Sequence, residues 1–307
     1  MNVVDAMKTA SRGLIHAKVR SLLTMVGIVI GIASVILLMS IGRSAERLIL
    51  DQVRSIGSNL IFIVPGATRG SRFASPPSVQ GVVIKTLVKA DLEALNREPA
   101  IAKAAPEVRG QAKIVFENND TTVTYDGTSE EFFDIRNFGI SRGRSFSNSD
   151  VDSFNRVAVL GSELSKTLFG ERDPVGKTVR LKDATFRVIG VLEEKGIGPF
   201  GVDQDNLVLV PITVAQKQLL GIDHYNVITA QAASDYTVEF AQGRVVSLLR
   251  HNHRITDPSK DDFTIRTQED ALSLLGNITS ILTVFLTSIA FIALVVGGIG
   301  IMNIMLV

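Results

Sequence analysis

The sequence contains no cysteine and no tryptophan, and only three tyrosines. Without cysteine, the chain can have no disulfide framework, no thiolate metal site and no cysteine nucleophile. Positive and negative charges are nearly balanced: the sequence has 32 Lys and Arg and 31 Asp and Glu, for a net charge of +1. The overall charge therefore gives no electrostatic basis for binding nucleic acid.

Complete motifs for phosphate or zinc binding are also missing. The segment GERDPVGKT (170–178) resembles a phosphate-binding loop, but Gly170 is one residue too far from Gly176. The predicted order around it is helix–loop–strand, the reverse of that motif, so we interpret it as a turn. The HNH sequence (251–253) offers two imidazoles where a zinc site needs three or four ligands. We interpret it as a basic group that complements the dipole at a helix C-terminus.

Acidic clusters are equally weak as sites. The loop GVDQDN (201–206) lacks the ladder of oxygen ligands that calcium requires, so we interpret it as a solvated loop. Adjacent carboxylates in a strand point to opposite faces and make poor acid–base couples; they are Glu130/Glu131, Glu193/Glu194 and Asp261/Asp262. We therefore predict no catalytic, cofactor-binding or metal-binding residue and no enzymatic activity in this chain.

Two long uncharged stretches lie near the ends of the chain, at 21–42 and 271–307. A bilayer core of about 30 Å needs about 20 apolar residues in a helix, and each stretch is long enough to cross. We predict a first transmembrane helix at 21–43, an extracytoplasmic domain at 44–270, and a stalk with an incomplete second transmembrane helix at 271–307.

Basic residues set the predicted orientation. The first 20 residues carry a single acid, Asp5, against four basic residues: Lys8, Arg12, Lys18 and Arg20. The positive-inside rule places this end in the cytoplasm and the central domain outside. Apolar residues recur there at spacings of three and four, which predicts an amphipathic helix on the inner membrane surface over 1–20. A cleaved signal peptide is the alternative, but its apolar region would be shorter and earlier.

Glycines are the candidate packing residues of the two crossings. Gly27 and Gly31 have the G-x-x-x-G spacing that lets a second helix approach closely. The second crossing contains Gly297, Gly298 and Gly300. Neither crossing contains Asp, Glu, Lys, Arg or His, which argues against a proton or ion path built from these helices.

The central region alternates strand and helix patterns. We predict helices at 85–98, 130–136, 163–170, 212–221 and 234–251. We predict strands at 59–66, 111–117, 121–127, 156–161, 206–211, 224–232 and 261–267, with a hairpin over 177–193. Ser162 is the expected N-cap of the third helix and Gly170 its stop. The pattern indicates an α+β domain of two lobes, with a lobe at about 118–222 inserted into the first.

Several segments resemble one family in order and spacing over essentially the whole chain: the permease subunit of MacB/FtsX-type ABC transporters, the macrolide-exporter class. The matching segments are RSLLTMVGIVIGIASVILLMSIG, IGSNLIFIVPG, RVAVLGSELSKTLFGERDPVGKTVRL, FRVIGVLEEKG, DQDNLVLVP and LVVGGIGIMNIMLV.

The resemblance implies a multi-pass protein of the bacterial inner membrane with a two-lobed periplasmic domain, one lobe similar to the porter units of other efflux systems. It implies a dimer, membrane lipid contact, and export driven mechanically by an ABC ATPase subunit that binds ATP and Mg²⁺. It also implies transfer to a periplasmic adaptor and an outer-membrane channel.

This sequence departs from the family pattern where it ends in apolar sequence and where no ATPase domain precedes the first crossing. We therefore expect a fragment that ends within the second transmembrane helix, with the ATPase on a separate chain. Two alternatives stay open: an FtsX-like regulator of a cell-wall hydrolase, and the ectodomain of a membrane receptor.

Overall fold

The structure is a computed structural model of the 307-residue chain. It describes residues 59–66, 84–196 and 203–305, together with residues 29, 32–33, 36–37, 39–40, 42 and 44. The predicted amphipathic helix over 1–20 and the pair Gly27 and Gly31 lie outside these residues.

The chain divides into two compact units, which we describe separately. One comprises Asp51–Ala271, and the other comprises Met1–Leu50 with Leu272–Val307. In the part of the chain that the structure describes, no helix combines the length and apolarity needed to span a bilayer.

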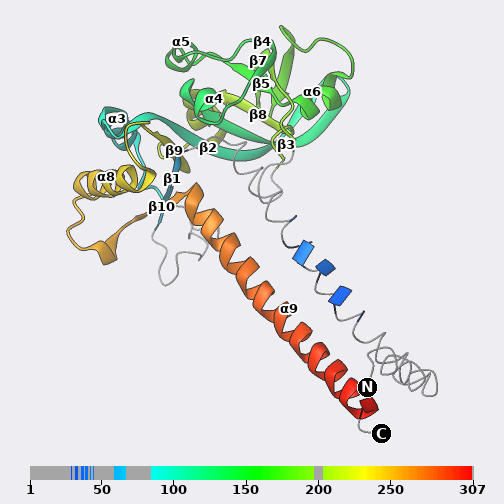
Figure 1. Ribbon diagram of the computed structural model, residues 1–307. Helices are drawn as coiled ribbons and strands as arrows, with labels where there is room; N and C mark the ends of the chain where they lie inside the picture. The colour runs from blue at the N-terminus through cyan, green and yellow to red at the C-terminus, as the bar shows by residue number, and fades with distance from the viewer. Residues whose placement is uncertain are drawn as a thin grey trace. The chain divides into compact units, whose positions relative to one another are not determined.

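The first part of the sheet is antiparallel and contains strands from both ends of the larger unit (Figure 1). Its order is β10 (Phe263–Thr267), β1 (Leu60–Pro65), β9 (Val227–Ala232) and β2 (Ile101–Phe116). Within it, Ile63 of β1 pairs with Ile265 of β10 and with Ile228 of β9. The continuous apolar run LIFIVP is typical of a strand with neighbours on both edges, which is the position of β1.

Strand β2 is 16 residues long and joins two parts of the sheet. Residues 101–107 pair with β9, whereas 108–116 pair with β3 (Asn119–Thr128). From β3 the order continues through β8 (Leu207–Pro211), β5 (Val157–Leu160), β7 (Ala184–Leu192) and β4 (Ile140–Gly143). Strand β6 (Thr178–Leu181) pairs with β2 and β7. The pairs β3–β8 and β5–β7 are parallel, so this is a mixed α/β domain.

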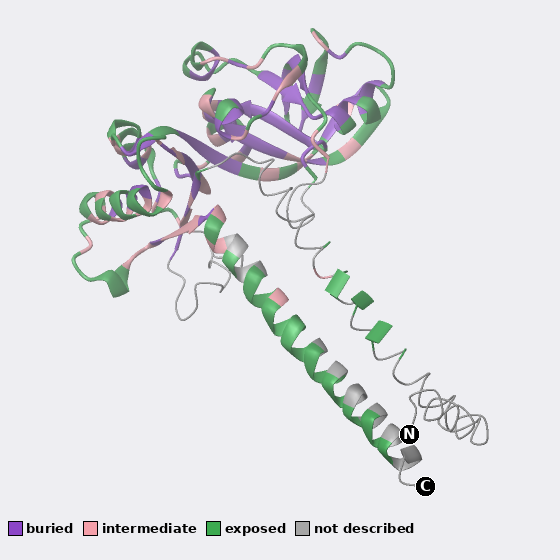
Figure 2. Cartoon of the chain, in the orientation of Figure 1, coloured by how far each residue is buried: buried purple, intermediate pink, exposed green. Residues whose placement is uncertain are grey.

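Helices pack on both parts of the sheet. Helices α3 (Lys89–Arg97) and α8 (Val238–Asn252) contact each other, and α8 also contacts β1 and β10. The other helical elements of this unit are α4 (Glu131–Ile135), α5 (Asn148–Asp152), α6 (Ser162–Phe169), α7 (Ile212–Val214), the π-helix η3 (Ala215–Leu220) and the 3₁₀ turn η4 (Pro258–Lys260). Buried side chains concentrate in the strands (Figure 2).

Most of the predicted elements are present, and one cap was wrong. The turn over 170–178 is confirmed: α6 ends at Phe169, Gly170 is its C-cap with φ +61°, and β6 begins at Thr178. Ser162, however, is the first residue of α6 and its hydroxyl has no hydrogen-bond partner. The N-cap is Gly161, and the amides of Glu163 and Leu164 donate to the Asp205 carbonyl at 3.2 and 3.3 Å. A distant backbone carbonyl therefore replaces the serine cap.

The acidic loop at 203–206 is also different from the prediction. The Asp205 side chain is buried, and its carboxylate accepts hydrogen bonds from the amides of Lys195 at 2.9 Å and Gly196 at 2.7 Å. Our interpretation as a solvated loop was therefore wrong for Asp205, because its buried carboxylate connects this loop to the segment at 195–196.

Helix α9 (Gln268–Met305) is 38 residues long and follows β10 without a loop. From Ile278 to Met302 it exposes large apolar side chains, among them Ile281, Val284 and Phe285. Three hydroxyls on this helix, those of Thr283, Thr287 and Ser288, donate to the carbonyl four residues earlier.

Candidate functional site

Strands β1 and β10 are the first and the last strand among the described residues, and they are neighbours in the sheet. We call this pair the base of the larger unit. They pair antiparallel over five register positions, from Ile61–Thr267 to Pro65–Phe263. The pairing is extended beyond β1 by the Gly66 amide, which donates to the Asp262 carbonyl at 2.7 Å. Thr264 Oγ1 also donates to the Gly66 carbonyl at 2.6 Å. The two strands are therefore joined along their length by backbone pairing and by these two further hydrogen bonds.

The junction between β10 and α9 is a capped helix start. The Thr267 amide donates to the Asp270 carboxylate at 2.9 Å, and the Asp270 amide donates to Thr267 Oγ1 at 3.1 Å. This reciprocal pair is the capping-box arrangement that fixes the first turn of a helix. Because Thr267 is also the last residue of β10, the helix begins directly after the strand.

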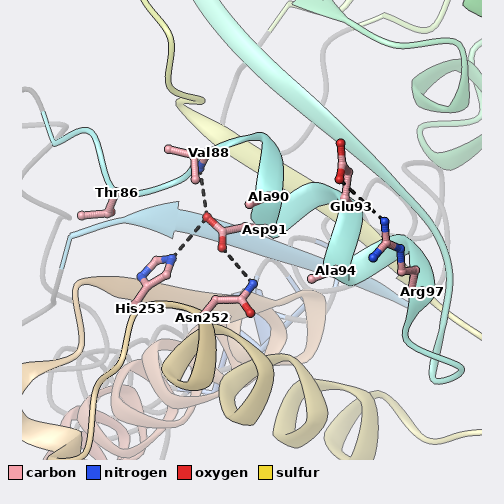
Figure 3. A pocket seen from close by; sticks show the side chains of 9 residues that line it. All are labelled: Thr86, Val88, Ala90, Asp91, Glu93, Ala94, Arg97, Asn252 and His253. Carbon is pink, nitrogen blue, oxygen red and sulfur yellow. Dashed lines mark hydrogen bonds and ion pairs between the residues drawn. The ribbon is translucent and has the colours of Figure 1, made fainter.

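Ion pairs connect helices α3 and α8 to the segment before β10. Asp91 of α3 is 1% exposed in its side chain, and His253, directly after α8, is 9% exposed. Their atoms His253 Nε2 and Asp91 Oδ2 lie 3.2 Å apart, and His253 Nδ1 lies 2.7 Å from Asp262 Oδ1. Figure 3 shows Asp91 between His253 and Asn252, whose Nδ2 donates to Asp91 at 3.2 Å. We call Asp91, His253 and Asp262 the base cluster.

The electrostatics of the base cluster favour a charged imidazole. Burial opposes the charge, but the contacts with the carboxylates of Asp262 and Asp91 outweigh it, and together they raise the pKa of His253 above 6.5. Asp91 also accepts from the Val88 amide at 3.0 Å, which caps α3. The open cavity beside the cluster is lined by Asp91, Asn252 and His253. Asp91 contacts the other two, which connects α3 to the end of α8.

A second group of buried charges lies where β2 passes from one part of the sheet to the other. Arg109 binds Asp126 of β3 through two hydrogen bonds, of 2.6 and 2.9 Å. Glu107 is buried, accepts a hydrogen bond from Thr229 of β9, and lies 3.9 Å from Arg109. Burial raises the pKa of Glu107, although the nearby Arg136 acts in the opposite sense. These side chains join three strands at the crossing point.

This raised pKa predicts a pH-dependent effect of Glu107→Gln. A folded-state pKa above the unfolded value means that the folded protein binds the proton more tightly, so Glu107 contributes less stability as pH rises above about 4.5. Glutamine keeps an acceptor for Thr229 without the charge. We expect the variant to gain stability relative to the unmodified protein between pH 5 and pH 8, measured by urea unfolding. A gain in stability that does not depend on pH would contradict a raised pKa of Glu107.

The structure places the predicted packing glycines of the second stretch in α9. A Cβ added at Gly298 would meet no atom within 4 Å, and Gly297 and Gly300 lie within the same helix. Packing through these glycines needs a partner helix, so this role stays a prediction, as it does for Gly27 and Gly31.

The sequence did not lead us to predict the base cluster, although the HNH sequence (251–253) contains His253. The signal was available: Ala241, Val245 and Leu249 form the buried stripe of α8, and His253 continues that spacing of four. A histidine in a buried stripe needs polar partners. In the described residues, no three His, Cys, Asp or Glu side chains are placed to hold a metal ion.

Comparisons with known proteins agree with this architecture. The model of the MacB-like periplasmic core domain family matches residues 21–248. The macrolide export ATP-binding/permease protein MacB of Rhodospirillum rubrum is 37% identical over 305 residues, covering 99% of this chain and 45% of that protein. The protein of the same name in Marinobacter nauticus is 36% identical, with the same coverage. This chain thus spans about half the length of these relatives.

Solved structures share the fold. The periplasmic region of MacB from Actinobacillus actinomycetemcomitans aligns with a TM-score of 0.62 at 26% identity, over 75% of this chain and 98% of that one. The extracellular domain of the ABC-type transporter YknZ aligns with a TM-score of 0.54 at 20% identity, over 68% of this chain and 100% of that one.

The fold places the larger unit in a class of protein domain, the periplasmic domains of MacB-like transporters. Within that class, this chain belongs to the MacB-like ABC transporter permease family, with its MacB-like periplasmic core domain. The resemblance noted in the sequence is confirmed.

Proposed function

We propose that this chain is a permease component of an ABC exporter in the bacterial inner membrane. In this proposal an ABC ATPase that binds ATP and Mg²⁺ moves the membrane helices, and strands β1 and β10 pass that motion to the periplasmic domain. The observation that carries the proposal is the direct pairing of β1 with β10, with α9 following β10 through a capped junction. Such a connection transmits displacement without loss in a flexible linker.

Features of α9 support its place in lipid. Its exposed side chains between Ile278 and Met302 are largely apolar, as a lipid-facing surface requires. The hydroxyls of Thr283, Thr287 and Ser288 are satisfied within the helix, so they need no water. With the basic residues before the first uncharged stretch, this supports a cytoplasmic N-terminus and a periplasmic central domain.

Partners follow from the family. We propose a homodimer or permease pair, and delivery to a periplasmic adaptor and outer-membrane channel. The relatives' shared name, macrolide export ATP-binding/permease protein, favours export over the regulation of a cell-wall hydrolase or a receptor role. That name joins ATP binding and permease in one protein, so our expectation of a separate ATPase chain stays a prediction.

A pair of insertions in α9 tests the coupling. Seven residues placed between Ala271 and Leu272 lie beyond the capping box, so β10 and the helix start are preserved. A helical heptad (EAAAKEA) adds about 10 Å and changes the phase by only about 20°. A flexible heptad (GGSGGSG) of the same length breaks the rigid connection.

The readouts are ATP hydrolysis by the complete transporter and macrolide resistance of an exporter-deficient host. We expect the flexible heptad to preserve hydrolysis but to lower resistance to that of the empty host, whereas the helical heptad retains much of it. Equal resistance from both insertions would overturn mechanical coupling. No resistance from the unmodified transporter would overturn macrolide export.

A further inference from the structure

A second open cavity lies in the part of the sheet away from β1 and β10. Its walls are the end of β4 at Gly143–Arg144, the turn at Asn155–Arg156 between α5 and β5, and the turn at Val175–Gly176. Its floor is β7 from Arg187 to Ile189. Three arginines thus reach one concavity from three separate elements, and the proposed function uses none of them.

The cavity carries an excess of positive charge. The residues that line it include three arginines, Arg144, Arg156 and Arg187, and a single acidic residue, Asp150. The Asp150 side chain is buried, and its carboxylate already accepts several hydrogen bonds. The donors include Arg144 at 2.8 Å, the Ser147 amide at 3.1 Å and Asn155 at 2.9 Å. Asp150 therefore orients Arg144 but has little capacity left to neutralise the other two arginines.

The arginines keep most of their donors available. Arg144 uses one terminal nitrogen, Nη1, for Asp150 and for the Ser145 carbonyl. Arg156 uses only Nε, which donates to the neutral amide oxygen of Gln218 at 2.7 Å. Among the described residues, the Arg187 side chain has no hydrogen bond or ion pair, although it rises from β7 between Val157 of β5 and Thr178 of β6. The guanidinium donors that no protein group uses are therefore available to the oxygens of an anion.

We propose that this cavity binds a phosphoryl group. A guanidinium presents a planar fork of donors that matches phosphate oxygens in pairs. Three such forks around one cavity suit a tetrahedral group with several charged oxygens better than a single carboxylate, which two arginines already satisfy. The group could be carried by an anionic lipid or by a soluble phosphorylated molecule, and the two sources share this chemistry.

The test uses the whole chain in phosphatidylcholine nanodiscs, titrated with inorganic phosphate by calorimetry at low ionic strength. The informative variants are Arg187→Gln and Arg156→Gln. The matched control is Arg180→Gln, which removes the same charge from an exposed arginine on β6 outside the cavity lining. Because all three side chains are exposed, we expect each variant to keep the fold, checked by circular dichroism.

We expect Arg187→Gln and Arg156→Gln each to weaken phosphate binding about tenfold, since each removes a charge-assisted contact, and Arg180→Gln to change it less than twofold. Equal losses in all three variants would show diffuse electrostatics and overturn the site, as would the absence of detectable phosphate binding to the unmodified chain.

Titration with water-soluble dihexanoyl phosphatidic acid then identifies the source. If the Arg187-dependent affinity for it exceeds that for inorganic phosphate, the site recognises a lipid headgroup. Equal affinities support a soluble phosphorylated ligand. Both results keep the phosphoryl site, and neither depends on whether the α9 insertions uncouple transport.

Discussion

Replacing His253 with leucine is expected to lower the free energy of unfolding by about 3 kcal/mol, because it leaves a buried carboxylate without its cationic partner. The Asp91 side chain is 1% exposed and lies 3.2 Å from the imidazole. Leucine has a similar volume but can form neither the ion pair with Asp91 nor the hydrogen bond with Asp262. The measurement is urea unfolding of the chain in detergent micelles followed by circular dichroism, since the sequence has no tryptophan.

His251→Gln is the matched control for this change. His251 belongs to the same HNH sequence and the same end of α8, but it is exposed. We expect its effect to stay within about 0.5 kcal/mol. The double variant Asp91→Asn with His253→Leu should lose less than the sum of the single losses, because the unpaired charge is gone. Additive losses would show that the two side chains do not interact.

The same histidine gives a pH dependence of defined sign. Its pKa in the folded protein is raised above the unfolded value of about 6.5. Its contribution to stability is therefore complete below about pH 6.5 and is lost as pH rises through the folded pKa. The difference in stability between the unmodified protein and His253→Gln should accordingly be larger at pH 6 than at pH 9. A difference that grows with pH would contradict a charged imidazole in the base cluster.

Replacing Gly161 with alanine is expected to destabilise the larger unit by about 3 kcal/mol, the upper end of the usual cost of overpacking. A Cβ at Gly161 would lie 2.1 Å from the Asp205 carbonyl oxygen and 2.7 Å from its carbon. This carbonyl accepts from Glu163 and Leu164 at the start of α6, and the Gly161 amide donates to Leu207 at 2.9 Å. Relieving the clash must therefore disturb both the helix cap and the β5–β8 contact.

Gly243→Ala is the same chemical change with the opposite expected sign. Gly243 is exposed inside α8, and a Cβ there would meet nothing within 4 Å. Because alanine is the better helix former, we expect a gain of about 0.5–1 kcal/mol. Both variants are compared by thermal and urea unfolding. A loss below about 1 kcal/mol for Gly161→Ala would mean that the segment at Asp205 gives way easily.

Local sequence signals were sufficient to predict the elements whose conformation depends mainly on neighbouring residues. Nearby residues account for the apolar run of β1, the hairpin of β6 and β7 around Lys182, and the C-cap of α6 at Gly170. Strand β2 was predicted only from residue 111, because its first half contains Pro106 and charged residues. Its length comes from pairing with β9, which no local pattern encodes.

The sequence by itself determined the two uncharged stretches, the mixed order of strands and helices between them, and the family, because each depends on composition or on neighbouring residues. Only the tertiary structure decided that β1 and β10 lie side by side, that the Asp205 carbonyl caps α6, and that His253 meets Asp91 and Asp262. These contacts join residues far apart in the chain, so their partners become known only once the backbone has brought them together.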